Sequence, residues 1–162
     1  MSAPDRDRDE TGRPRNARPR DAFGRPLPRG AAGVARVPDD YAPDAARAVA
    51  DARGHLAAGR PFHAHEVLEA RWKTGPAGER DLWQGLAQIC VGLTHLQRGN
   101  ARGAAVLLGR GATTLARYRP PAGDDPAVDP RAAGETAREL ATAPPPDPAV
   151  AITRVLELFP GH

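Results

Sequence analysis

Residues 61–73, PFHAHEVLEARWK, decide the fold of this chain. On a helical wheel at 100° per residue, Phe62, His65, Leu68, Glu69 and Trp72 fall within an arc of about 120°. This stripe predicts a helix that packs against other helices. It also carries two polar side chains, and a carboxylate on a buried stripe must be paired or neutralised, because burying it alone costs several kcal/mol.

Start and stop signals on both sides of this segment predict further helices. Asp44, Asn100 and Asp147 are suited to cap helix N-termini, and Gly59 and Gly99 are suited to end helices in the left-handed conformation. The fold class is therefore all-α, a compact antiparallel helical bundle of four main helices plus weaker C-terminal helices. The expected ranges are about 44–58, 61–74, 77–98 and 100–118, then 130–142 and 148–159.

An internal similarity supports short turns between the helices. The string HLAAGRPFHAHEVL from His55 matches HLQRGNARGAAVLL from His95, at an offset of 40 residues. Each copy places a helix end, a tight turn and a new helix start in the same order. The pattern resembles tetratricopeptide-like stacking and favours antiparallel helices joined by one kind of turn.

Proline and glycine divide the chain into three parts. The chain holds 18 prolines and 17 glycines, which concentrate outside its middle. Residues 1–42 read as a flexible Arg/Pro-rich arm, with Phe23 and Leu27 as anchors if the arm packs on the bundle. Residues 43–120 form the predicted helical core domain. Residues 121–162 form a C-terminal loop and short helices that pack on the core.

The charge balance does not by itself predict nucleic-acid binding. The formal net charge is only +3, and 22 arginines accompany a single lysine, Lys73. The high isoelectric point, about 9.7, follows from this near-absence of lysine, since arginine does not titrate in that range. An excess of arginine, alanine, glycine and proline is what a GC-rich genome produces without functional pressure.

The cysteine count and hydropathy predict a soluble cytoplasmic protein without a membrane partner. Cys90 is the single cysteine and cannot form an internal disulfide. The first residues lack the apolar run of a secretory signal. The longest apolar-rich segment, 82–96, is too short to span a bilayer and is interrupted by Gln84, Gln88 and His95.

The predicted third helix, about residues 77–98, contains polar residues that can pair with His65 and Glu69. Gln84, Gln88 and His95 form a polar line on this helix, bordered by Gly85 and Gly92, which would let a neighbour approach closely. We expect this line to face His65 and Glu69 and to form a buried polar cluster between the two helices. Its predicted members are His65, Glu66, Glu69, Trp72, Gln84, Gln88 and His95.

Three interpretations of this cluster stay open at this point. The first is a structural hydrogen-bond network in which Glu69 orients His65. The second is a site for a divalent metal held by His65, Glu69 and His95, although HEVLE lacks the HExxH spacing of metalloproteases. The third is acid/base chemistry or small-molecule binding, with Glu66 or Glu69 as the base and Trp72 as a pocket wall. His55 and His63 are expected at the surface or at a helix end, without a role.

The same residues carry a family resemblance. The segment FHAHEVLEARW, followed by WQGLAQICVGLTHLQRGNARGAAVLL, resembles the family catalogued as domain of unknown function 309. The resemblance covers about residues 45–118, and the arm around NARPRD is similar to that of actinobacterial members. It implies a compact helical bundle and supplies no activity. The matching positions are Phe62, His65, Glu66, Glu69, Trp72, Gln84, Gly85, Leu86, Gln88, His95, Arg98, Gly99 and Asn100.

The sequence therefore predicts a soluble helical module that acts through binding or structure. A metal-dependent or acid/base enzyme centred on His65, Glu69 and His95 is the alternative. Nucleic-acid association through the N-terminal arm is the second alternative. A protein partner or a homo-oligomer is compatible with all of these.

Overall fold

A computed structural model describes residue 25 and residues 37–161. All secondary structure within this part of the chain is helical, which confirms the predicted fold class. The predicted anchors Phe23 and Leu27, like most of the predicted arm, lie outside the described residues. The helices are α1 (Ala45–Ala57), α2 (Pro61–Thr74), α3 (Arg80–Gln97), α4 (Ala101–Arg117), α5 (Pro130–Thr142) and α6 (Pro148–Leu156), with a 3₁₀ turn, η1 (Ala77–Glu79), before α3.

The predicted caps are confirmed at three helix starts. The Asp44 carboxylate accepts a hydrogen bond from the backbone N–H of Arg47 at 2.8 Å. The Asn100 side chain accepts from Gly103 N–H at 2.9 Å, and Asp147 accepts from Ala149 N–H at 3.0 Å. Each bond satisfies one of the backbone donors that the first turn of a helix leaves without a partner. These side chains therefore fix where α1, α4 and α6 begin.

The two turns of the internal similarity have the same backbone geometry. Gly59 and Gly99 adopt φ values of +73° and +75°. In the first turn, Arg60 N–H donates to the carbonyl of His55 at 2.8 Å; in the second, Asn100 N–H donates to the carbonyl of His95 at 2.8 Å. This is the six-to-one hydrogen bond of a Schellman motif, with glycine in the left-handed position. The predicted helical hairpins are therefore confirmed.

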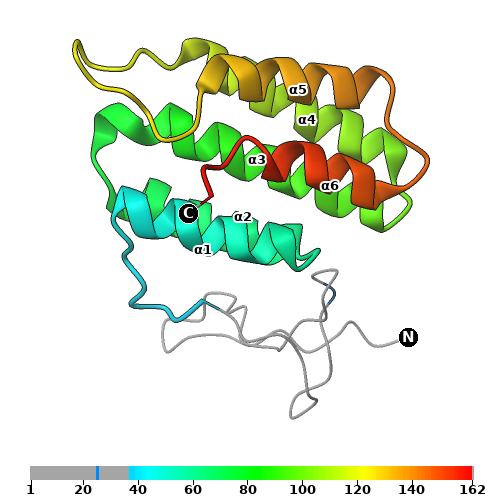
Figure 1. Cartoon of the computed structure of the whole chain (residues 1–162), viewed down its shortest axis with the longest axis horizontal. Helices are drawn as coiled ribbons and strands as arrows, with labels where there is room; N and C mark the ends of the chain where they lie inside the picture. Colours follow the sequence, from blue (N-terminus) through cyan, green and yellow to red (C-terminus); the bar gives the residue numbers. More distant parts are fainter. Residues whose placement is uncertain (1–24, 26–36, 162) are drawn as a thin grey trace, which may run out of the picture.

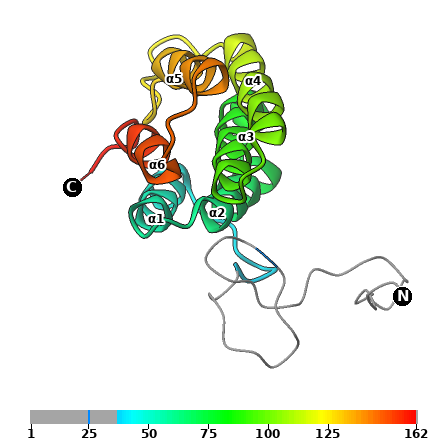
Figure 2. The ribbon, with the colours of Figure 1, turned by 90° about the vertical axis from the view of Figure 1, so that its right-hand side faces the viewer.

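The helices are arranged as an arc that is filled from the inside. Figure 1 shows α5 above α3 and the α1–α2 pair below it, with α6 in front of α3. Viewed end-on in Figure 2, α1 to α5 follow one another around the arc, and α6 lies on its inner side. Consistent with this view, α6 packs against α1, α3 and α5. The C-terminal helix thus completes the core rather than extending the arc.

Glycines bring α3 and α4 into close contact. A Cβ atom on Gly85 would lie 2.6 Å from Cγ of Leu115, and one on Gly92 would lie 2.7 Å from Cγ of Leu108. Gly111 of α4 is equally close to Ile89. The predicted close approach is therefore confirmed, and the neighbour that makes it is α4.

The core runs through the whole arc. Leu68, Leu86, Leu93 and Leu108 are among its fully buried side chains. Cys90 is also buried, and burial raises the pKa of its thiol to about 12. The thiol is therefore protonated and unreactive at neutral pH. None of the described helices is both long enough and apolar enough to cross a membrane.

Candidate functional site

His65 and Glu69 form an ion pair on the outer side of α2. Nε2 of His65 lies 2.9 Å from Oε2 of Glu69, and Nζ of Lys73 lies 2.5 Å from Oε1 of the same carboxylate. The hydrogen bond from His65 is the largest influence that lowers the pKa of Glu69, to about 2; burial opposes it and Lys73 adds to it. Glu69 is therefore ionised at neutral pH and is held from both sides.

The contacts of His65 limit its chemistry. Its Nδ1 lies 3.0 Å from the carbonyl oxygen of Phe62, while its Nε2 faces Glu69. Both ring nitrogens therefore already contact acceptors within α2. In this arrangement neither nitrogen is directed at a substrate, as a general base would need to be. The geometry supports the interpretation in which Glu69 orients His65.

The polar line of α3 faces α4 instead of α2. Oε1 of Gln88 accepts a hydrogen bond from Thr114 of α4 at 2.7 Å. Nδ1 of His95 lies 3.2 Å from the side-chain amide of Asn100, at the turn after α3. Gln84 is half-buried on the same helix. The structure therefore does not bring Gln88 or His95 to the His65–Glu69 pair, because the glycines beside this line admit α4 to that position.

The three residues of the predicted metal set are likewise not brought together. His65 and Glu69 are one turn apart on α2, whereas His95 lies at the last turn of α3 beside Asn100. Across residues 37–161, no group of three or more His, Cys, Asp or Glu side chains is placed so that it could hold a metal ion. The geometry therefore offers His65 and Glu69 as a pair and not as part of a three-ligand set.

A histidine pair between α1 and α2 was missed by the sequence analysis. His63 is only 1% exposed, so its predicted surface position is wrong. Its ring stacks on that of His55, with ring centroids 5.7 Å apart. Nδ1 of His55 accepts a hydrogen bond from Nε of Arg60 at 3.2 Å, and burial, followed by Arg60, lowers the pKa of His55. Since α2 packs against both α1 and α3, its buried arc is wider than one apolar stripe and includes His63.

Arg71 makes a second connection that the sequence analysis missed. Its guanidinium donates to Glu79 at 2.7 Å and to the carbonyl of Pro43 at 3.3 Å, and it lies 5.7 Å from the ring centroid of Trp83. The indole N–H of Trp83 donates to the same Glu79 carboxylate at 2.9 Å. Although burial opposes it, the hydrogen bonds from Trp83 and Arg71 lower the pKa of Glu79. Arg71 therefore joins the segment before α1 to α2 and to the start of α3.

Trp72 packs partly buried against the core, and the guanidinium of Arg80 lies 5.5 Å from its ring centroid. This places Trp72 beside the start of α3, whereas it was predicted as a pocket wall next to the acidic residues of α2.

The acidic residues of α2 line a cavity of about 310 Å³, which we call the acidic cavity. One wall comes from α2 and the other from the segment that precedes α1, represented by Val37, Asp39 and Tyr41. Its lining residues come from these two segments, and α3 contributes none of them. The lining residues from α2 that matter chemically are Phe62, His65, Glu66, Glu69 and Lys73.

Comparison with known families identifies the segment that contains this wall. Residues 49–107 match the model of the family described as Domain of unknown function (DUF309). This segment of the chain is therefore similar to the DUF309 family. The matched residues include all of α2 and α3 and therefore His65, Glu66, Glu69 and the polar line of α3. Comparison with curated proteins and with solved structures found no match.

A second cavity, of about 500 Å³, lies on the other side of the same N-terminal segment. Its charged lining comes from Arg47, Asp51 and Arg60, with His55 and Tyr41 beside them. The Tyr41 hydroxyl donates to the Asp51 carboxylate, and burial, followed by this carboxylate, raises the pKa of Tyr41. Tyr41 thereby attaches the segment before α1 to α1 itself.

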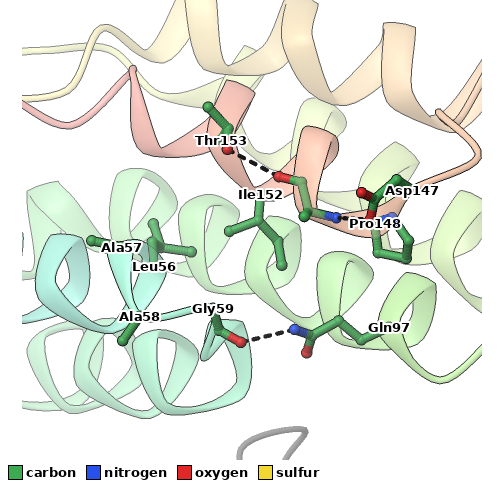
Figure 3. A pocket seen from close by; sticks show the side chains of 10 residues that line it. Leu56, Ala57, Ala58, Gly59, Gln97, Asp147, Pro148, Ile152 and Thr153 are labelled. Atoms are coloured by element: carbon green, nitrogen blue, oxygen red, sulfur yellow. Dashed lines mark hydrogen bonds between the residues drawn. The ribbon is translucent and has the colours of Figure 1, made fainter.

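The third cavity, of about 560 Å³, lies between α6 and the ends of α1 and α3 (Figure 3). It is lined by the end of α1, by Gln97 of α3 and by Pro148, Ile152 and Thr153 of α6. Nε2 of Gln97 donates to the carbonyl of Gly59 at 2.8 Å, which spans the floor of the cavity. The single carboxylate here, Asp147, caps α6. This cavity therefore offers little charge for recognition.

Proposed function

We propose that this chain is a binding module whose acidic cavity receives the cationic group of a small organic ligand, a primary amine or a guanidinium. The observation that carries the proposal is the lining of that cavity. Carboxylates of Asp39, Glu66 and Glu69 and aromatic rings of Tyr41 and Phe62 meet around a space of about 310 Å³. A volume of this size is at the lower end of the range for ligand pockets.

The charge of the cavity favours a cation. Glu69 is compensated by His65 and Lys73, which both contact its oxygens. Glu66 adds a second carboxylate to the α2 wall, and Asp39 adds one to the opposite wall. An ammonium or guanidinium group gains from carboxylates through charge-assisted hydrogen bonds, and from aromatic faces through cation–π attraction. The cavity combines both kinds of group.

Binding fits this geometry better than acid/base catalysis does. His65 has both ring nitrogens against acceptors, and the lowered pKa of Glu69 makes its carboxylate a weak base. Cytoplasmic location, a protein partner and a homo-oligomer stay predictions from the sequence. So does nucleic-acid binding by the N-terminal arm, which lies almost wholly outside the described residues.

The proposal is tested by calorimetric titration with agmatine and putrescine as cationic probes and butyrate as the anionic counterpart. We expect both amines to bind and butyrate not to bind. Glu66→Gln removes one carboxylate while keeping the shape of the side chain, and it should weaken amine binding about tenfold, as the loss of a charge-assisted hydrogen bond predicts.

Glu135→Gln on the exposed surface of α5 removes the same charge at a distance and is the matched control. Amines that bind no better than butyrate would contradict the proposal. So would equal losses of affinity in Glu66→Gln and Glu135→Gln, since net charge alone would then explain the binding.

A further inference from the structure

A stretch of the chain centred on α4 is free of acidic residues. Between Arg98 and Gly123 there are five arginines and not one aspartate or glutamate. Three of the arginines, Arg102, Arg110 and Arg117, belong to α4 itself. The acidic cavity lies on α2 and shares no residue with this stretch, so the two features are independent.

The three arginines of α4 lie on one face of the helix. At 100° per residue, Arg102, Arg117 and Arg110 fall within an arc of about 80°. All three are exposed, while the opposite side of α4, with Ala104, Leu108 and Leu115, is buried. At 1.5 Å per residue, the arginines extend over about 22 Å along the helix. Figure 2 shows α4 on the outside of the arc, between α3 and α5.

The guanidinium groups of this face differ from several on other helices, which pair with carboxylates. Arg71 pairs with Glu79, and Arg154 pairs with Glu139. Within the part of the chain that the structure describes, the guanidinium groups of Arg102, Arg110 and Arg117 make no ion pair and no hydrogen bond. Arg119, by contrast, donates to the carbonyls of Ala116 and Tyr118 and closes the end of the helix.

We infer that this arginine face, Arg102, Arg110 and Arg117, docks on the phosphate backbone of double-stranded nucleic acid. The planar guanidinium presents paired donors that match two phosphate oxygens, and a row of them over about 22 Å can reach several phosphates. Such contacts position a protein on a duplex without reading its sequence. Val106 and Thr113 lie between the arginines on this face, and Ala105 and Gly109 lie at its edge. None of these side chains is longer than that of valine, so the guanidinium groups extend beyond them toward a phosphate backbone.

Other polyanionic partners fit this face less well. A stable protein interface has an apolar, desolvated centre, and the only exposed large hydrophobic residue of α4 in the described chain is Val106, at 46%. Insertion into a membrane surface needs an apolar helix face, and that of α4 is buried against α3 and α5. A positively charged face without an apolar centre is typical of a surface that binds the phosphate backbone of nucleic acid.

The test is fluorescence anisotropy of a labelled 20-base-pair duplex with the full chain, measured from 50 to 200 mM NaCl. Three phosphate contacts contribute about 0.9 each to the slope of log K against log salt, so they account for about a forty-fold loss of affinity over this range. Replacing Arg102, Arg110 and Arg117 by glutamine should therefore weaken binding at 50 mM NaCl and flatten the slope by about 2.7. Unchanged circular dichroism and melting temperature will show that the variant folds.

The matched control replaces Arg131, Arg138 and Arg154 by glutamine, which removes the same charge from α5 and α6. The inference holds only if the α4 variant loses much more affinity than this control. Equal losses would show an effect of net charge and would overturn it, as would full binding by the α4 variant. If poly-glutamate of equal charge competes as well as unlabelled duplex, the face recognises acidic protein and the assignment to nucleic acid is overturned.

Discussion

The turn after α1 and the turn after α3 share one backbone and differ in their side chains. Both place glycine at positive φ, and both close with a hydrogen bond of 2.8 Å back to a histidine carbonyl. In each, Nδ1 of that histidine contacts the residue after the glycine, Arg60 in the first turn and Asn100 in the second. The two turns are therefore repeats down to a side-chain contact.

The residue eight positions after the histidine separates the two turns. In the first turn it is His63, which is buried and stacks on His55. In the second it is Gly103, where a Cβ atom would lie 2.5 Å from the Asn100 amide and 3.0 Å from Nδ1 of His95. One turn thus uses its histidine to build a buried pair, while the other leaves room for a helix cap. A repeated backbone does not imply a repeated role for its side chains.

The largest difference between the turns should appear in the leucine that precedes each one. Leu56 is 1% exposed and Leu96 is 9% exposed. Leu56→Ala should lower the free energy of unfolding by about 3–4 kcal/mol, as expected for a fully buried leucine, and Leu96→Ala should lower it less. Urea denaturation of both variants measures the difference. A larger loss for Leu96→Ala would show that the second turn is the more tightly packed.

Substitution of Gly59 and Gly99 tests whether a side chain at the positive-φ position destabilises the two turns equally. A Cβ atom on Gly59 or on Gly99 would meet nothing within 4 Å, so the positive φ is the main cost of a substitution. Gly59→Ala and Gly99→Ala should each lower the free energy of unfolding by about 1–2 kcal/mol. The comparison predicts equal losses in the same denaturation experiment. A difference well above the error of the fits would contradict the equivalence of the turns.

For helix capping, the larger loss of stability is expected in the second turn, whereas for the buried leucines it is expected in the first. Asn100 caps α4, whereas Arg60 makes no side-chain cap for α2, which begins with Pro61. Proline at this first position removes one of the backbone N–H groups that the start of a helix leaves without a partner. Asn100→Ala should therefore cost about 1 kcal/mol and Arg60→Ala less. Thermal unfolding followed by circular dichroism measures both, and equal shifts in melting temperature would argue against this role for Asn100.

The smallest expected effect is a pH dependence specific to the first turn. Burial and Arg60 lower the pKa of His55 below its ordinary value of 6.5. Below about pH 6.5 the unfolded chain then binds more protons than the folded chain, so the free energy of unfolding should fall as the pH drops. His55→Gln should reduce this dependence between about pH 7.5 and pH 5.5, with His95→Gln as the matched control. A wild-type slope in the His55→Gln variant would contradict the prediction.

Local features of the fold could be predicted from the sequence because they depend on neighbouring residues. Asp44, Asn100 and Asp147 cap helices by contacting a backbone two or three positions away. Gly59 and Gly99 end helices because glycine has no Cβ atom and therefore adopts a positive φ without strain. The family resemblance found on the same residues is confirmed by the match over residues 49–107.

The candidate site was only partly predictable because it depends on which helices become neighbours. A helical wheel places His65 beside Glu69, and the structure confirms that pair. It does not show that the polar line of α3 faces α4, since that choice rests on the fit of Gly85 and Gly111 across the two helices. Arg71 joins three separate segments, so no single window of sequence reveals its contacts.

The position of α6 decides which surfaces of the molecule are open to partners. Curved arrays of helical hairpins commonly bind their targets on the concave side. In this chain the C-terminal helix occupies that side and packs on α1, α3 and α5 (Figure 2). The concave side is therefore covered by α6, a helix of the same chain. The two binding surfaces that we propose, the acidic cavity on α2 and the arginine face of α4, share no residue with α6 or with each other, so under these proposals both can be occupied at the same time.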